Sequence, residues 1–395
     1  MTVLTDLPFA RNKSGTAYSN LENITVACEN APELQGLVWY DAFLDRLMTG
    51  GPAREWTDAD DVRVTIQLQQ DYGLKAVKPK DVSAVLDQRA RAFPRHVVRE
   101  WLETLVWDGE PRIAQAFEDH WGASPTADQP PDYLECASRN FLIGLVARVM
   151  RPGCKLDTMP VFEGPQGIYK SSALAVLVGE SWHTTSHESV TSKDFFQALS
   201  GKWLVEIAEL DSFSRAEVNR VKSVMSTATD RYRASYGRLS ADHPRQCAFA
   251  GTTNSDNWGR DESGLRRFWP VTCGTINLDT LREARAQLFA EALAAFKAGQ
   301  GWWAMPESTK AVQAARQQES AIADILRPWL IGKTDVTVAE VCTGPLKVDG
   351  GRIGKVLEMD VARVLKLEGW TRGRVWRDGK QIRAWVEPGG GLGVV

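Results

Sequence analysis

The stretch that most constrains the fold of this chain is residues 159–172, with the sequence MPVFEGPQGIYKSS. A short apolar run leads into a loop with two glycines, a Lys-Ser pair follows, and residues 173–178 are again apolar. Strand, glycine-bearing loop, Lys-Ser and helix is the layout of a P-loop. In a P-loop, backbone N–H groups surround phosphate oxygens, the lysine reaches the β- and γ-phosphates, and the serine hydroxyl and the helix N-terminus complete a Mg²⁺-nucleotide site. The stretch therefore predicts such a site, and the alternative is an ordinary glycine-rich turn between a strand and a helix.

One position of this loop departs from the P-loop pattern G-x-x-x-x-G-K-[ST]. The glycine expected before the lysine is replaced by Tyr169. If this position needs a positive φ angle, a residue with a Cβ atom strains the backbone there. We therefore expect either a reduced affinity for the nucleotide or a tyrosine ring that stacks on a ligand. The residues predicted to bind the nucleotide are Gly164, Pro165, Gln166, Gly167, Ile168, Tyr169, Lys170, Ser171 and Ser172.

Length and composition limit what the rest of the chain can be. With 395 residues it is too long for one typical core, so we expect two or three domains. The formal net charge is −3, so any surface that binds nucleic acid is a local patch. No run is long enough to span a bilayer and the N-terminal residues lack an apolar signal core, which predicts a cytoplasmic protein. Six cysteines without a C-x-x-C pair indicate reduced thiols and argue against a zinc site.

Apolar strands alternate with helical segments from residue 159 to about residue 300, which predicts a layered α/β domain with a mostly parallel sheet. The expected strands are 159–163, 181–185, 203–208, 247–252 and 267–272, and the expected helices include 171–179, 192–200, 214–228 and 278–298. We divide the chain into an N-terminal α-rich domain (1–115), a P-loop domain with a helical lead-in (116–300) and a C-terminal domain (301–395).

The C-terminal domain is expected to begin with a helix at 308–327 that ends at Pro328. Helices at 336–342 and 352–368 and a hairpin over 373–386, with Asp378-Gly379 as its turn, then follow in the order of a winged helix-turn-helix. Seven basic residues against two acids between positions 363 and 383 suit DNA binding, and a winged helix that contacts protein is the alternative. The residues predicted to bind DNA here are Arg363, Lys366, Arg372, Arg374 and Lys380.

A nucleoside triphosphatase also needs an acid at the tip of a neighbouring strand, which holds Mg²⁺ and polarises the attacking water. The segment 202–211, KWLVEIAELD, is an apolar strand that ends in acids. Glu209 lies where the strand should end, so we favour it as the catalytic acid and, together with Ser171, as a metal residue. Glu206 lies within the strand, where a lone carboxylate is costly to bury, so we expect a second metal-shell acid or a partner of a basic residue. Solvent-facing acids on an edge strand are the alternative.

Further polar groups follow the acids. Asn254 comes after the next strand, where an amide could position the attacking water, and a turn asparagine is the alternative. Arg266 and Arg267 precede the last strand and could reach a γ-phosphate in the same subunit or across an interface, or they could form a solvated pair. A basic segment with tyrosines suits phosphate contacts and base stacking on a single strand, or equally a contact between subunits or with the nucleotide. Its candidate residues are Arg231, Arg233, Tyr236 and Arg238.

Five motifs in this order resemble the virulence-associated protein E family, which belongs with superfamily 3-like helicase ATPases of the AAA+ class in phages and mobile elements. They are PVFEGPQGIYKSS, KWLVEIAELDSF, DRYRASYGR, PRQCAFAGTTN and GLRRFWPV. WTDADD and LVWDGEPR, upstream, also resemble the segment before the ATPase core of that family. The resemblance is strongest over roughly residues 100–272 and weaker outside this range.

The resemblance implies an ATP-dependent DNA helicase or translocase in phage or mobile-element replication, with ATP and Mg²⁺ between the subunits of a ring that is expected to be a hexamer. The expected partners are single-stranded or forked DNA and other replication proteins, and no membrane. The family pattern assigns Lys170 and Ser171 to phosphate and metal, Glu206 and Glu209 to the acidic motif, Asn254 to sensing, and Arg266 or Arg267 to an arginine finger.

Other functions remain open at the level of the sequence. The main alternative is a DNA-binding replication or regulatory protein whose AAA+ fold binds nucleotide without turnover, or binds none, and Tyr169 is its main support. A kinase-like phosphotransferase is disfavoured by the double arginine and the basic terminal module. Some relatives carry a primase domain, but residues 1–115 are too few for one, so we expect no primase activity.

Overall fold

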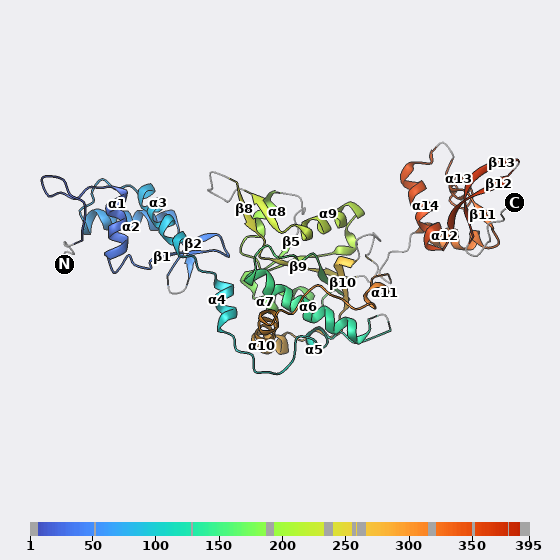
Figure 1. The fold of residues 1–395 in the computed structure, drawn as a ribbon, viewed down its shortest axis with the longest axis horizontal. Helices are drawn as coiled ribbons and strands as arrows, with labels where there is room; N and C mark the ends of the chain where they lie inside the picture. The colour runs from blue at the N-terminus through green and yellow to red at the C-terminus, as the bar shows by residue number, and fades with distance from the viewer. Residues whose placement is uncertain are drawn as a thin grey trace. The chain divides into compact units, whose positions relative to one another are not determined.

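The computed structural model describes residues 7–50, 53–127, 129–186, 193–232, 240–254, 258, 266–314, 321–349, 352–377 and 379–387 (Figure 1). The chain forms two compact units, Met1–Arg316 and Gln317–Val395. The first unit contains both the N-terminal part and the α/β part, together with residues 301–316. The division into three domains therefore stays a prediction.

The N-terminal part of the first unit is built from helices and a small antiparallel sheet. Its elements are α1 (Leu21–Asn30), β1 (Val38–Asp41), β2 (Arg46–Thr49), β3 (Arg54–Glu55), α2 (Asp58–Asp71), α3 (Pro79–Ala92) and α4 (Val97–Thr104). At the start of α2, Asp60 Oδ2 accepts hydrogen bonds from the backbone N–H and the hydroxyl of Thr57 at 3.0 and 2.9 Å. These bonds fix the start of α2.

The centre of the first unit is a five-stranded parallel sheet, which confirms the predicted α/β fold. Its strands are β4 (Met159–Glu163), β5 (His183–Ser186), β6 (Leu204–Ile207), β9 (Ala248–Thr253) and β10 (Phe268–Thr272). They lie in the order β10-β4-β9-β6-β5. β9 therefore separates β4 from β6, and the carboxyl ends of all five strands meet at one edge of the sheet.

Both faces of this sheet are buried, because alternate residues of β4, β6, β9 and β10 belong to two different cores. Phe162 of β4 packs with α5 (Ala116–Trp121), α6 (Pro131–Met150), α7 (Lys170–Val178) and α10 (Leu278–Lys297) on one face. Val161, the next residue back, packs with α8 (Lys193–Ala198) and α9 (Arg215–Ser226) on the other face (Figure 1). The strands consequently read as continuous apolar runs in the sequence.

Replacing Trp203 with alanine is expected to lower the free energy of unfolding by about 3–5 kcal/mol. Trp203 is fully buried, its ring centroid lies 4.5 Å from that of Phe289, and its indole N–H donates to the Leu145 carbonyl at 2.9 Å. The substitution removes this packing and the hydrogen bond to the carbonyl. Denaturant unfolding measures the loss, and Phe93→Ala, at a side chain that is 84% exposed, serves as a control with almost no effect.

Shorter elements complete the first unit. They are the 3₁₀ turns η1 (Glu180–Trp182) and η2 (Leu210–Ser212), the antiparallel pair β7 (Thr229–Tyr232) and β8 (Ala241–Pro244), and α11 (Thr309–Ala314). The β7–β8 pair has no counterpart among the strands that the sequence predicts. β7 includes Arg231 of the basic segment, and charged residues on both strands leave no apolar run by which to predict them. No helix in the described ranges is long and apolar enough to cross a membrane.

The second unit contains helices and a three-stranded antiparallel sheet of order β11-β13-β12. Its elements are α12 (Ala321–Leu330), β11 (Asp335–Val336), α13 (Val338–Thr343), α14 (Lys355–Leu367), β12 (Thr371–Arg377) and β13 (Lys380–Val386). The helices predicted at 336–342 and 352–368 and the hairpin are therefore present, although Asp378 of the predicted turn lies outside the described residues. The helix predicted at 308–327 corresponds to two helices, α11 and α12, and residues 315–320 between them lie outside the described residues. One boundary prediction was wrong: α12 continues through Pro328 to Leu330 instead of ending at the proline.

Candidate functional site

The carboxyl edge of the sheet gathers the polar residues that follow β4, β6 and β9. β4 ends at Glu163, the loop 164–169 follows, and α7 begins at Lys170. Asn254 directly follows β9, which lies beside β4 in the sheet. Because β9 lies between β4 and β6, Asn254 comes next to the loop on one side and to the end of β6 on the other. The strand order thus brings segments far apart in sequence to one place.

Positive φ angles shape the loop between β4 and α7. Gly164 has a φ of 149°, and a Cβ atom there would lie 2.8 Å from Ile168 Cδ1, so the position requires glycine. Tyr169, the N-cap residue of α7, has a φ of 70° and a side chain that is 61% exposed. Position 169 therefore does need the left-handed conformation that the sequence led us to suspect, which costs a tyrosine about 1–2 kcal/mol.

Replacing Tyr169 with glycine is expected to raise the free energy of unfolding by about 0.5–1 kcal/mol. Glycine relieves the left-handed strain, but part of this gain is lost because glycine has more freedom in the unfolded chain. Thermal unfolding measures the change. Tyr169→Ala is the matched control, since it removes the exposed ring and keeps the strain. A glycine variant no more stable than the alanine variant would contradict the assignment of strain to this residue.

The ammonium group of Lys170 is enclosed by oxygen atoms of the loop and of Asn254. Its Nζ donates to the carbonyl oxygens of Gly164 and Pro165 at 2.6 and 2.8 Å and to Asn254 Oδ1 at 3.2 Å. Lys170 is only 8% exposed. Among the described residues, no side chain caps the N-terminus of α7, so its first N–H groups face the same loop. The lysine and the helix end together form a positive region that suits an anion.

The carboxylate of Glu206 is the centre of a second cluster beside the loop. Glu206 is fully buried in β6, an inner strand of the sheet, so the alternative of a solvent-facing acid on an edge strand does not hold for it. Its oxygens accept hydrogen bonds from the hydroxyls of Ser171 (2.6 Å), Thr252 (2.6 Å) and Thr185 (3.0 Å). His183 Nε2 lies 3.5 Å from Glu206 Oε2.

These neighbours decide the protonation state of Glu206. Burial alone would raise the pKa of this carboxyl group, but the nearby imidazole of His183 and the hydrogen bonds from Ser171, Thr252 and Thr185 outweigh burial and hold the pKa below its usual value. Glu206 is therefore an anion whose lone pairs are directed at donors. The Ser171 hydroxyl and the Glu206 carboxylate together offer oxygen atoms of the kind that Mg²⁺ prefers.

Glu209 lies in a different environment from Glu206. It follows the end of β6, has a φ of 54° and is exposed. The turn η2 after it packs closely on β9, because a Cβ atom on Gly251 would lie 2.4 Å from Leu210 Cδ1. The structure thus brings Ser171 to Glu206 and not to Glu209. The assignment of Glu209 as the catalytic acid and as a metal residue stays a prediction.

Apart from Ser171, the partners of Glu206 were not predicted from the sequence. Thr252 lies near the end of β9. The polar run Thr252-Thr253-Asn254 at the end of an apolar strand could have indicated that it belongs to the site. His183 and Thr185 alternate along β5 and so face the same side of the sheet. All four residues of β5 are polar and partly buried, and a fully polar strand inside an α/β domain is the signal that could have found them.

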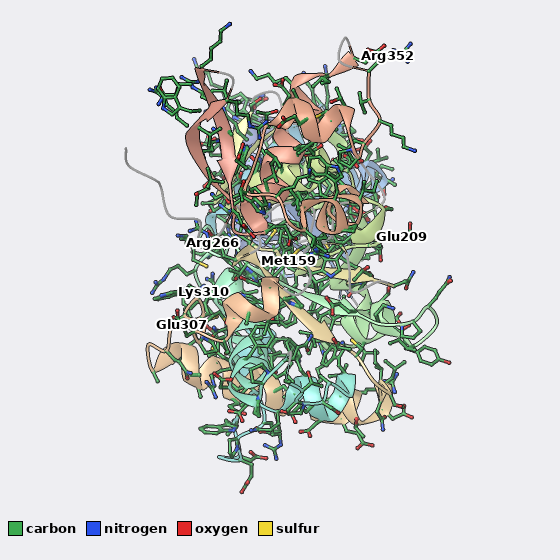
Figure 2. All side chains as sticks on the ribbon, turned by 90° about the vertical axis from the view of Figure 1, so that its right-hand side faces the viewer. Met159, Glu209, Arg266, Glu307, Lys310 and Arg352 are labelled. Carbon is green, nitrogen blue, oxygen red and sulfur yellow. The ribbon has the colours of Figure 1, made fainter. Side chains whose placement is uncertain are left out.

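Arg266 and Arg267 lie at the opposite edge of the sheet. They directly precede β10, whose first residue Phe268 pairs with Met159, the first residue of β4. A strand of five residues spans about 16 Å, so the two arginines lie roughly that far from the edge that holds Lys170. Figure 2 likewise shows Arg266 and Glu209 on opposite sides of the view. Within one chain, the structure does not bring the two arginines to the loop.

The predicted DNA-binding residues fall into two groups. On β7, the side chain of Arg231 is 72% exposed and lies 3.5 Å from Asp242, whereas Arg233, Tyr236 and Arg238 lie outside the described residues. In the second unit, Lys366, Arg372, Arg374 and Lys380 are exposed, and the side chain of Arg363 lies outside the described residues.

The hairpin of the second unit concentrates positive charge on one face. Arg372 and Arg374 lie two residues apart on β12, and Arg374 pairs directly with Arg383 of β13. Like charges opposite each other destabilise a sheet unless an anion neutralises them. Lys380 pairs with Arg377 on the other face. The arginine-bearing face can therefore take an anion.

Comparison with known proteins gives one family and a group of similar structures. The family described as the virulence-associated protein E-like domain matches residues 102–321, which is more than half of the chain. No curated protein matches the sequence. Two apo structures of the NrS-1 C-terminal region, residues 305–718 of that protein, have 16% and 13% identity and TM-scores of 0.42 and 0.41. Each alignment covers 89% of this chain, and 95% or 96% of the other.

Proposed function

Because the chain belongs to the virulence-associated protein E-like domain family, we propose that it is an ATP-dependent DNA helicase or translocase that acts in phage or mobile-element replication. The observation that carries the proposal is the cluster of Lys170, Ser171, Glu206 and Asn254 around the loop at the carboxyl edge of the sheet. Ligands of open parallel sheets bind at this edge.

In this proposal the loop 164–169 is a P-loop that holds the triphosphate of ATP. Backbone N–H groups at the start of α7 face the phosphates. The ammonium of Lys170 exchanges its contacts with the loop carbonyls for contacts with phosphate oxygens, and Asn254, which already contacts Lys170, senses the terminal phosphate. Ser171 and Glu206 hold Mg²⁺, which supplies neutralisation of phosphate charge when it is bound.

The two glutamates then have separate roles. Glu206 is a poor base, since its oxygens accept hydrogen bonds from several donors and its pKa is lowered. Glu209 is exposed at the end of the same strand and is free to orient the water that attacks the γ-phosphate. Glu206 therefore positions the metal and Ser171, and Glu209 is the catalytic acid of the proposal.

An arginine finger, in this proposal, comes from a second copy of the chain. Arg266 lies at the amino edge of the sheet, so it reaches a nucleotide only if that edge packs on the carboxyl edge of a neighbour. Such head-to-tail packing closes into a ring when the rotation between copies allows it. We propose a hexameric ring, which light scattering with ATP and DNA tests. A monomer under all conditions would exclude the finger.

DNA binding is proposed for the winged-helix-like second unit. Its hairpin presents Arg372, Arg374 and Arg383 on one face, and Lys366 on α14 is exposed as well. This charge suits the phosphate backbone of DNA.

DNA-stimulated ATP hydrolysis is the experiment that tests the proposed function. An active protein turns over ATP faster when single-stranded DNA is added. The second candidate is a DNA-binding replication or regulatory protein that binds ATP without turnover, and the strained Tyr169 favours it. A large gain of turnover in Tyr169→Gly over the natural protein would support this second candidate.

A further inference from the structure

A cavity of about 740 Å³ lies in the first unit at the amino edge of the sheet, away from Lys170. Its volume is in the range of pockets that bind small organic ligands. Arg266, Lys310 and Glu307, which line it, lie on the same side of the view in Figure 2. Nothing in the proposed ATP site uses this cavity apart from the two arginines that precede β10.

The wall of this cavity contains buried polar atoms that lack a partner. Within the described ranges, Trp269 Nε1, Arg267 Nε and Thr309 Oγ1 make no hydrogen bond. Trp269 is 1% exposed and Thr309 is 7% exposed. Burying such groups is unfavourable unless an acceptor meets them. These three atoms are themselves buried, so the contacts to a ligand fall to the exposed cations of the lining.

The charge of the lining favours an anion. Its cations are Arg151, Lys155, Arg266, Arg267 and Lys310, and its carboxylates are Asp157 and Glu307. Both carboxylates already have cationic neighbours: Asp157 lies 3.9 Å from Arg267 and 4.0 Å from Lys155, and Glu307 lies 2.6 Å from Lys310. The surplus of positive charge therefore remains for a ligand, and phosphate oxygens supply both the charge and the acceptors.

An exposed aromatic ring borders the same cavity. Trp303 is 65% exposed and meets the ring of Trp302 edge-on, with centroids 5.1 Å apart. Trp302 is buried, and its indole N–H donates to the Lys155 carbonyl at 3.0 Å, which fixes the pair. A ring held in this way beside cations is a platform on which a base can stack.

We propose that this cavity binds one nucleotide unit, with its phosphate at Arg266 and Arg267 and its base on Trp303. The unit comes from a single strand of nucleic acid or from a free nucleotide, which share this chemistry. The proposal goes beyond the proposed ATPase, because it also holds for a protein that never hydrolyses ATP. The test leaves Arg266 and Arg267 unchanged, because these residues would also act as arginine fingers in a ring.

Photo-crosslinking of the full-length Lys170→Ala variant to a short oligothymidylate with 5-iodouracil tests the proposal. We expect a crosslink to Trp303 in the tryptic peptide 298–310. Trp303→Ala is expected to weaken oligonucleotide binding about ten-fold, because it removes one stacked base, and Trp303→Phe to retain most of it. Lys310→Ala is expected to weaken binding and reduce its salt dependence. The controls Phe93→Ala and Arg282→Ala lie at exposed positions outside the cavity and are expected to bind as before.

Competition distinguishes the two sources of the ligand. If thymidine monophosphate or ATP blocks the crosslink at Trp303, the cavity takes free nucleotides, and if neither does, it takes a single strand. An absent crosslink in the peptide 298–310, with unchanged affinity in Trp303→Ala, overturns the proposal. Since the crosslink is measured in the Lys170→Ala background, where turnover is strongly reduced, this failure is distinct from a failure of the proposed ATPase, which is measured with Lys170 in place.

Discussion

Replacing Lys170 with alanine is expected to lower DNA-stimulated ATP turnover by at least about 100-fold. The ammonium group is the cation nearest the loop, enclosed by the carbonyls of Gly164 and Pro165 and by Asn254. Preorganised charge of this kind typically contributes several kcal/mol to phosphoryl transfer, and each 1.36 kcal/mol corresponds to a factor of ten. Steady-state hydrolysis with and without single-stranded DNA measures the loss.

Two variants separate loss of chemistry from loss of structure in that experiment. Lys170→Arg keeps the charge but not the compact ammonium, and we expect it to be impaired as well, because the enclosed site fits three oxygens around a single nitrogen. Lys75→Ala, at an exposed position in the N-terminal part, is expected to leave turnover unchanged. If natural protein and Lys170→Ala hydrolyse ATP at the same rate, the proposed enzyme function is wrong.

Local signals were sufficient to predict the strands of the central sheet. Four of the five strands are short, mostly apolar runs, and the predicted and observed limits of β4 coincide at 159–163. The order of the strands could not be read from the chain, because it depends on which long-range pairs form. Insertion of β9 between β4 and β6 is the step that brings Asn254 to Lys170, and it becomes visible only in the folded sheet.

The candidate site shows where sequence reasoning reached its limit. It placed less weight on Glu206, because a lone buried carboxylate is unfavourable. However, the donors that satisfy Glu206 come from β5, α7 and β9, segments that no local pattern connects with β6. The position of Arg266, in contrast, could have been predicted from the sequence. Residues that precede a strand of a parallel sheet lie at its amino edge, so a finger acting within one chain could have been excluded earlier.

Replacing Glu206 with glutamine is expected to lower the free energy of unfolding by about 2 kcal/mol or more at neutral pH. The substitution removes a charge that accepts hydrogen bonds from Ser171, Thr252 and Thr185, and its amide group would point N–H donors at hydroxyl donors. We also expect a loss of Mg²⁺-dependent turnover of about 100-fold, since Ser171 loses the partner that orients it. Denaturant unfolding and hydrolysis at several Mg²⁺ concentrations measure the two effects.

The stability difference between the natural protein and Glu206→Gln depends on pH in a defined direction. The folded-state pKa of Glu206 lies below its usual value of 4.5, so the carboxylate stabilises the fold fully above about pH 4.5. This stabilisation is lost as the pH falls through the lowered pKa, where the folded protein also takes up the proton. The two unfolding curves should therefore converge in acid. A constant difference down to low pH would mean that the charge of Glu206 is not what the hydroxyls stabilise.

Glu209→Gln is the matched comparison, which we expect to lose turnover with almost no change in stability. Glu209 is exposed, so the substitution should change the free energy of unfolding by less than about 0.5 kcal/mol. Turnover should nevertheless fall about 100-fold while ATP binding persists, because a glutamine at this position cannot polarise the attacking water. Together the two variants separate a glutamate that organises the metal from one that acts on water. Full turnover in Glu209→Gln would move the catalytic role to another residue at the carboxyl edge of the sheet.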